Sequence, residues 1–349
     1  MNIIKKYFAK LRGKSSPEML DIQMRTLFLR GCSKTISLNE KWGIFDYDFS
    51  NIFTNYNIGD GIQSLAVKNF KKIYFPETSE IILDRENIST YEGDPILLIM
   101  QGYFTHTKYF LPRAPITPIW VGTHFNLFAK TFLKEFVQNY PDYFNGVNVG
   151  CRDISTRDFL ESIGVKSYLS RCLTLTFPLR KKQMDERVFI VDVPSKLHKY
   201  IPEKIRRNAI INKQRAVPYK TYSSFEKRLE ISQQTLDLYR DNASLVITTA
   251  LHCASPCLAM GIPVIFIDVG KESARFSSLD NIIPIYSKED LENKRIDFNN
   301  VPIPNIENLK ELIFSNLSLT ILQGMGQLSE NGKKDLDEIR NKIKDFNAM

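Results

Sequence analysis

The sequence has little of what marks membrane-spanning and secreted proteins. Its longest apolar runs, at positions 95–100 and 262–267, are far shorter than the ~18 residues needed to cross a bilayer. The first twelve residues lack the long apolar core of a secretory signal, so we expect a cytoplasmic protein. These twelve residues are also basic and amphipathic. We expect them either to contact the inner face of a membrane or to form a solvated terminal helix.

Cysteine and histidine are scarce. The five cysteines are odd in number and lie in apolar or strand-like segments, which is unlike a disulfide framework. Cys253 and Cys257 are four residues apart on an expected helix, but no second pair of Cys or His completes a tetrahedral metal site. We therefore expect reduced, packed thiols and no metal. Only four histidines are present, of which His252 lies in the most informative segment of the chain.

The charge balance is basic, with a formal net charge of +8. It favours acidic partners, namely phosphorylated metabolites, acidic glycans, anionic lipid or nucleic acid. The basic residues are scattered, and no aromatic-interleaved recognition motif accompanies them. The composition therefore argues against nucleic acid as a partner.

Apolar strand-like runs alternate with amphipathic helical stretches through most of the chain, which is typical of α/β domains with parallel sheets. A polar segment without periodicity falls near 177–186. We expect two Rossmann-like domains facing a cleft. Within the second, 196–212 is predicted to be mostly helical and 217–222 to be a strand. The expected division is a basic extension at 1–40, domains at 41–180 and 187–300, and C-terminal helices at 301–349.

The segment 248–265 predicts the end of a strand, a helix that opens on His252, and the next strand. Ligands of parallel sheets lie where strand ends meet helix N-termini, which present free N–H groups and partial positive charge. Thr248, Thr249 and His252 would converge there on a phosphate or carboxylate. Histidine can act as an acid or as a phosphate ligand near neutral pH, or it can simply cap the helix from a half-buried position. Gly261 and the proline after it predict where the helix stops.

Two further loops carry candidate site residues. Asn57, Gly59 and Asp60 precede a helix, where glycine permits close approach of a ligand and Asp60 could bind a hydroxyl or act as a base. The alternative is that Asn57 or Asp60 caps the helix. Arg152 and Asp153 follow a strand, and the arginine fork suits a carboxylate or phosphate. The alternative is that Arg152 and Asp153 form a surface pair and cap the next helix.

Lys271 and Arg275 follow the strand that ends at Asp268. If the sheet is parallel, both lie on the same rim as His252 and add positive charge to an anion site. The alternative is a solvated charged loop.

Taken in order, the Asn57-x-Gly59-Asp60 loop, the Val149–Asp153 strand end with its helix, and the 245–252 segment with Gly261-Ile262-Pro263 resemble the polysaccharide pyruvyltransferase family. The resemblance covers about 55–287. It implies a fold like that of two-domain GT-B glycosyltransferases, with an acceptor-side N-terminal domain and a donor-side C-terminal domain. The implied donor is phosphoenolpyruvate, a substrate rather than a cofactor, and the implied acceptor is a surface glycan or its lipid-linked precursor.

The resemblance also implies roles for individual residues. His252 would be the acid or the phosphate contact, Arg152 a donor-binding cation, and Asp60 a residue of the acceptor side. Many family members carry an arginine immediately before the Leu251-His252 pair, where this chain has Ala250. Lys271 or Arg275 would then have to supply that cation. The expected catalytic residues are thus His252 and Asp60, and the expected substrate-binding residues are Asn57, Gly59, Arg152, Asp153, Thr248, Thr249, Leu251, Lys271 and Arg275.

Other functions fit the same cleft. A glycosyltransferase of the GT-B type would hold the diphosphate of a nucleotide sugar at the same helix N-terminus. A related module that binds glycan without catalysis is the second alternative.

Overall fold

The computed structural model describes residues 41–181, 186–270 and 273–349. The expected basic extension at 1–40, and with it the membrane-contacting dodecamer, lies outside the described residues, as does Lys271.

The first half of the chain builds two parallel sheets that continue one another. One has the order β3-β1-β4-β6 and the other β5-β7-β8-β9. The break between the sheets is short: the N–H of Met100 donates to the carbonyl of Ile119 at the end of the β4–β6 ladder, and the N–H of Gly102 donates to the carbonyl of Gly122 at the start of the β5–β7 ladder. The strands are β1 (Lys41–Asp46), β3 (Glu80–Asp84), β4 (Ile96–Ile99), β5 (Gly102–Phe104), β6 (Ile116–Ile119), β7 (Thr123–Phe125), β8 (Val149–Cys151) and β9 (Ser167–Leu169).

Helices connect these strands, and three begin at a side-chain cap. Asn57, Asn126 and Asp153 accept hydrogen bonds from N–H groups in the first turns of α3, α4 and α5. The helical elements of this half are α3 (Ile58–Tyr74), η2 (Arg85–Thr90), α4 (Leu127–Asn139), η3 (Pro141–Phe144), α5 (Ile154–Ser162) and η4 (Leu173–Thr176).

The second half contains one five-stranded parallel sheet in the order β11-β10-β13-β14-β15. Its strands are β10 (Arg187–Val191), β11 (Ala209–Asn212), β13 (Ala243–Thr248), β14 (Val264–Asp268) and β15 (Ile285–Ser287). Its helical elements are η5 (Ser195–Tyr200), α6 (Glu203–Arg207), α7 (Phe225–Asn242), α8 (Leu251–Ala259), η6 (Ser273–Leu279) and α9 (Lys288–Glu292).

Of two local predictions for this half, one is confirmed and one is wrong. The stretch 196–212 is mostly helical, in η5 and α6, and then ends in the edge strand β11, whose apolar residues Ile210 and Ile211 are exposed. The strand predicted over 217–222 is reduced to the two residues of β12 (Val217–Pro218). The predicted stop of α8 is confirmed: Gly261 has φ of +74° and its N–H donates to the carbonyl of Leu258.

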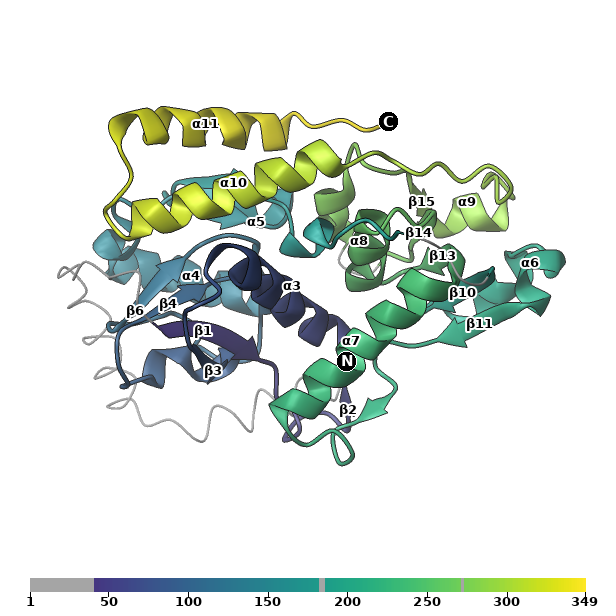
Figure 1. Ribbon diagram of the computed structural model, residues 1–349, viewed down its shortest axis with the longest axis horizontal. Helices are drawn as coiled ribbons and strands as arrows, with labels where there is room; N and C mark the ends of the chain where they lie inside the picture. The colour runs from purple at the N-terminus through teal and green to yellow at the C-terminus, as the bar shows by residue number, and fades with distance from the viewer. Residues whose placement is uncertain (1–40, 182–185, 271–272) are drawn as a thin grey trace.

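The two halves are tied together beside α3 and α7, which lie between the sheets in Figure 1. The short strand β2 (Asn55–Tyr56) of the first half pairs antiparallel with β12 of the second. On α7, Arg228 is buried and forms ion pairs with Asp46 at 2.6 Å and with Asp48 at 3.3 Å. Both carboxylates belong to the first half of the chain.

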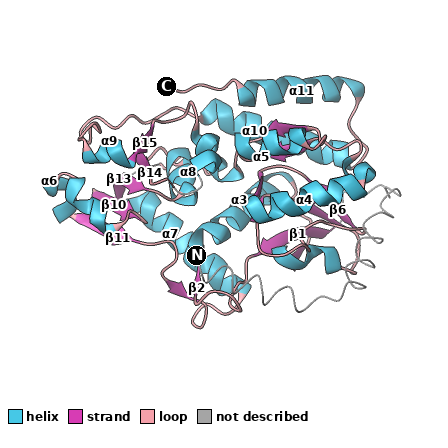
Figure 2. Ribbon diagram, turned by 180° about the vertical axis from the view of Figure 1, so that it is seen from behind, coloured by secondary structure: helices cyan, strands magenta, loops and turns pink. Residues whose placement is uncertain are grey.

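The chain ends in two helices that return over the first half. α10 (Glu307–Gly324) contacts β6 and η4, and α11 (Glu330–Lys344) contacts β9 and packs along α10. Figure 2 shows these two helices side by side along one edge of the molecule. The expected α/β architecture of two Rossmann-like units with parallel sheets is therefore confirmed. Within the described part of the chain, none of the helices combines the length and apolarity that a bilayer crossing requires.

Candidate active site

The predicted loops meet where Arg152, just after β8, contacts His252 in the first turn of α8. Arg152 Nη1 lies 3.2 Å from His252 Nε2. The guanidinium can only donate, so His252 Nε2 accepts, and the imidazole is neutral with its proton on Nδ1. Both side chains come from strand ends in different halves of the chain. The structure thus brings together two residues that are 100 positions apart in the sequence.

The N-terminus of α3 forms a third wall of this site. A Cβ atom added to Gly59 would lie 2.5 Å from Gln214 Oε1 and 3.1 Å from the Cβ of His252. Gly59 therefore permits the close approach of α3 to Gln214 and to α8. The neighbouring Gly61 serves helix packing instead, because a Cβ there would collide with Ser232 of α7 and with Tyr56.

Asp60 is connected to Arg152 through Gln63. Gln63 Nε2 donates to Asp60 Oδ1 at 3.3 Å, and Arg152 Nη1 is 3.5 Å from Gln63 Oε1. Asp60 is buried, and burial raises the pKa of its carboxyl group. The positive charges of Arg85 and Arg215 lower this pKa, but burial has the larger effect. Asp60 does not cap α3, since Asn57 performs that role.

Asp153 caps α5 through its Oδ1, which accepts from the backbone N–H of Thr156 at 2.9 Å. The capping alternative is therefore confirmed for Asp153, but Arg152 and Asp153 are both fully buried and do not form a surface pair. The other carboxylate oxygen of Asp153 lies 2.5 Å from His124 Nδ1. Asp153 thus orients a histidine as well as a helix.

Arg275, on η6, joins the same cluster. Its guanidinium lies 5.9 Å from the centre of the Tyr103 ring, which stacks on His124 at 4.8 Å. The positive charge of Arg275 also lowers the pKa of both His124 and His252. The residue therefore belongs to the site rather than to a solvated loop.

Three other predicted residues have structural contacts. Thr248 Oγ1 accepts from the N–H of Ala250, and Thr249 Oγ1 donates to the carbonyl of Asp192. Leu251 is buried in the core. These residues shape the turn between β13 and α8, which begins at Leu251 rather than at His252.

The electrostatics of the site favour an anionic ligand. Burial, followed by the charges of Arg152 and Arg275, holds the pKa of His252 well below its usual value. Two buried donors, Arg152 Nε and Gln214 Nε2, have no hydrogen-bond partner among the described residues. Because an unpaired buried donor costs about 1–3 kcal/mol, an anion that accepts from either donor would offset part of this desolvation penalty.

No metal-binding cluster accompanies this charge. The structure describes residues 41–181, 186–270 and 273–349. Among them, no group of three or more His, Cys, Asp or Glu side chains is arranged to hold a metal ion. Cys253 and Cys257 are buried free thiols, as are Cys151 and Cys172.

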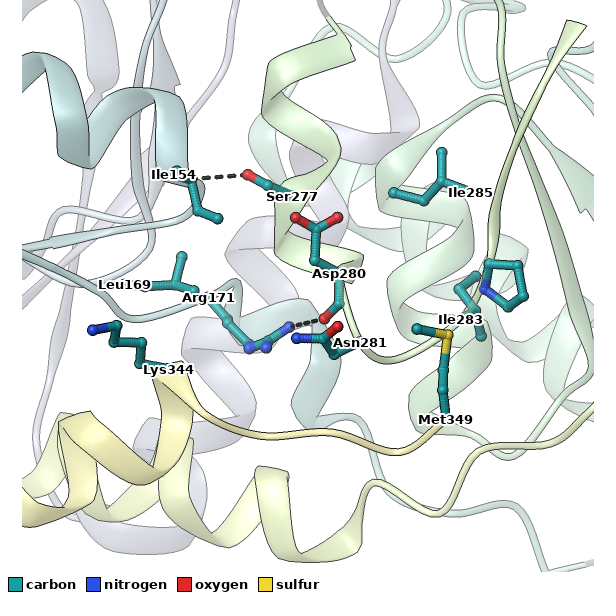
Figure 3. A pocket seen from close by; sticks show the side chains of 11 residues that line it. Ile154, Leu169, Arg171, Ser277, Asp280, Asn281, Ile283, Ile285, Lys344 and Met349 are labelled. Carbon is teal, nitrogen blue, oxygen red and sulfur yellow. Dashed lines mark hydrogen bonds between the residues drawn. The ribbon is translucent and has the colours of Figure 1, made fainter.

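A pocket of about 330 Å³ lies next to the cluster, between α5, η6 and the C-terminal residues (Figure 3). Ser277 on η6 accepts a hydrogen bond from the N–H of Ile154 at its edge. The buried Arg171 donates to the carbonyl groups of Ser278 and Asp280. Met349 and Lys344 line the opposite side, so the end of the chain forms part of this pocket.

Sequence patterns did not reveal Gln63, Gln214 or His124. Gln63 could have been found from its spacing, since it lies one helical turn after Asp60 on the same face. Gln214 and His124 carry no local signal, because only the tertiary fold brings them to the site.

The chain is similar to one known protein family and to solved structures of another protein. The family model described as polysaccharide pyruvyl transferase matches residues 57–271, which is more than half of the chain. No curated protein matches the sequence. Two solved structures of the wall teichoic acid polymerase TagF are similar at 9% identity. One is a structure of a substituted TagF protein soaked with CDPG. It has a TM-score of 0.36, and the match covers 98% of this chain and 97% of the TagF chain. The other has a TM-score of 0.35 and covers 98% of each chain. By the extent of the family match, the chain belongs to the polysaccharide pyruvyl transferase family.

Proposed function

We propose that the protein transfers the pyruvyl group of phosphoenolpyruvate to two hydroxyls of one sugar, forming a ketal in a surface polysaccharide, another cell-envelope glycan or a lipid-linked precursor. The observation that carries this proposal is the contact between the buried Arg152 and the partly buried His252, within the part of the chain that matches the family. It places a cation and a titratable group side by side at a helix N-terminus.

The donor would bind through its phosphate and carboxylate. Arg152 and Arg275 supply two cations, and Gln214 supplies a buried amide donor that no described residue pairs with. The first turn of α8 adds the partial positive charge of a helix N-terminus. Arg275 would then supply the positive charge that an arginine at position 250 supplies in many family members.

His252 would protonate C3 of the enol ether, which makes C2 electrophilic. In the ligand-free protein it cannot do so, because burial and the two arginines keep it neutral. A bound donor carries negative charge that offsets both arginines and therefore raises the pKa of His252. Binding of the donor would thus allow His252 to carry the proton that it transfers to C3.

The acceptor would enter from the side of Asp60. Near this carboxyl group, the exposed Arg215 places its guanidinium 5.2 Å from the centre of the half-buried Phe53 ring. Aromatic faces of this kind suit sugar rings, and Asp60 can accept a hydrogen bond from a hydroxyl.

The test is to incubate the purified protein with phosphoenolpyruvate and candidate glycans while measuring phosphate release and the mass of the sugar. We expect both phosphate and a pyruvylated sugar, and we expect His252→Ala to abolish both in a protein that still unfolds cooperatively. His198→Ala is the matched control, because His198 contacts only the carbonyl of Val193 among the hydrogen bonds of the structure. No product with phosphoenolpyruvate, together with thermal stabilisation by a nucleotide sugar, would point to a glycosyltransferase instead.

A further inference from the structure

The site contains a second histidine, His124, in the short strand β7. It is 5% exposed, and its Nδ1 lies 2.5 Å from Asp153 Oδ2 and 3.2 Å from Thr156 Oγ1. Both contacts engage the same ring nitrogen. The other nitrogen, Nε2, has no hydrogen-bond partner among the described residues.

Asp153 fixes the tautomer of this imidazole. Burial opposes ionisation of Asp153, but His124 and Arg152 outweigh it and lower the pKa of that carboxyl group. An ionised carboxylate can only accept, so His124 carries its proton on Nδ1 and presents a lone pair on Nε2. The ring is further held by Tyr103, which stacks on it with an interplanar angle of 17°. His124 is thus oriented by a carboxylate in the way that bases in hydrolase triads are oriented.

This imidazole lies beside both arginines of the candidate site. Arg152 Nε is 4.0 Å from the same Asp153 oxygen that contacts His124, and Arg275 lies over the Tyr103 ring that stacks on His124. The charges of both arginines lower the pKa of His124. His124 in turn contributes to the lowered pKa of His252. The two histidines therefore share one electrostatic environment but have different partners, a carboxylate for His124 and an arginine for His252.

We propose that His124, oriented by Asp153, is the base that takes the proton of the first attacking acceptor hydroxyl. This inference rests on the proposed function. The oxygen of that hydroxyl forms a bond to C2 of the donor while its proton moves to His124 Nε2. The second hydroxyl then bonds to C2 as the bond from C2 to the phosphate oxygen breaks.

The protons balance across the two histidines. His124 passes its proton to the leaving phosphate, and His252 recovers from the second hydroxyl the proton that it gave to C3. Of the two hydroxyl protons, one thus ends on the methyl group and the other on phosphate. Asp153 is a positioning residue that stabilises the imidazolium between the two steps.

The experiment compares the wild type with His124→Gln, Asp153→Asn and the control His198→Gln. Glutamine can still donate to Asp153 but cannot take a proton, and asparagine can still cap α5. Measurements are the dissociation constant of phosphoenolpyruvate, the rate of phosphate release with acceptor, and the pH profile of kcat. We expect donor affinity within about threefold of the wild type, and a kcat lowered about 10²–10⁴-fold in both site variants. We also expect His124→Gln to lose the acidic limb of the kcat profile.

Each outcome decides between distinct explanations. A folded His124→Gln variant with wild-type kcat and pH profile would overturn the inference while leaving the proposed function intact. Loss of donor binding with unchanged kcat would make His124 a binding residue and overturn its role as base. If the wild type releases no phosphate with any glycan, the proposed function fails and this inference fails with it. Should His124→Gln not fold, Asp153→Asn with wild-type kcat would overturn the inference on its own.

Discussion

Arg152 donates to the neutral imidazole of His252 across the junction of the two halves, over 3.2 Å. The same guanidinium reaches Gln63, which donates to Asp60. One arginine therefore joins the loop before α3, the end of β8 and the start of α8, which are the three segments that carry the family resemblance.

The first prediction concerns this arginine. Arg152→Gln removes a positive charge that depresses the pKa of His252, so the pKa of that imidazole should rise, as measured by NMR titration. The KM for phosphoenolpyruvate should rise about 10–100-fold, because a hydrogen bond to a charged group contributes roughly 1.5–3 kcal/mol. Arg207→Gln, which removes an exposed ion pair with Glu203, is the control and should change neither quantity. An unchanged KM in Arg152→Gln would exclude Arg152 from donor binding.

The second prediction concerns stability in acid. Burial lowers the pKa of His124 to about 4, whereas an unfolded histidine titrates near 6.5. The unfolded state therefore binds more protons between these values, and the stability that neutral His124 contributes is present above pH ~6.5 and is lost as the pH falls toward 4. On lowering the pH from 7 to 5, this loss should be on the order of 2 kcal/mol.

Urea unfolding at both pH values checks the loss. Comparison with His124→Gln isolates this imidazole from the carboxyl groups that titrate in the same range. Equal losses in the two proteins would contradict the buried neutral histidine.

Part of this site could be predicted from the sequence. The alternation of strands and helices predicts parallel sheets, and it predicts that the residues just after β8 and β13 carry the site. The N-caps at Asn57 and Asp153 follow from their residue types, because Asn and Asp side chains accept hydrogen bonds from helix N–H groups. Burial of Arg152 could not be predicted, because an arginine between a strand and a helix is ordinarily solvated. Nor could β11 be predicted, since its residues are half exposed at the sheet edge and follow a charged helical pattern.

The third prediction separates two glycines. Gly61→Ala places a methyl group against Ser232 and Tyr56, where two helices are in contact, and should destabilise the protein by about 1–3 kcal/mol. Gly59→Ala meets the end of the Gln214 side chain, which can move, so it should reduce donor affinity more than stability. Thermal unfolding and donor titration of both variants check this. The reverse ranking would contradict the assignment.

The fourth prediction concerns Arg228. Arg228→Met leaves the Asp46 carboxylate without its partner and should lower the free energy of unfolding by about 3 kcal/mol, measured by urea denaturation. Adding Asp46→Leu should recover part of the loss, because the unpaired charge is then removed. A single variant as stable as the wild type would show that the ion pair contributes nothing to holding the halves together.

The pairing of β2 with β12 has a consequence for how the halves can move apart. The N–H of Ile58, at the first residue of α3, donates to the carbonyl of Gln214, three residues before β12. Any rotation that kept these bonds would have to use this edge as its axis. Such a rotation would have to break the hydrogen bonds that join the halves beside α5 and η6, namely the bond from the N–H of Ile154 to Ser277 and the two bonds from Arg171 to the carbonyl groups of Ser278 and Asp280.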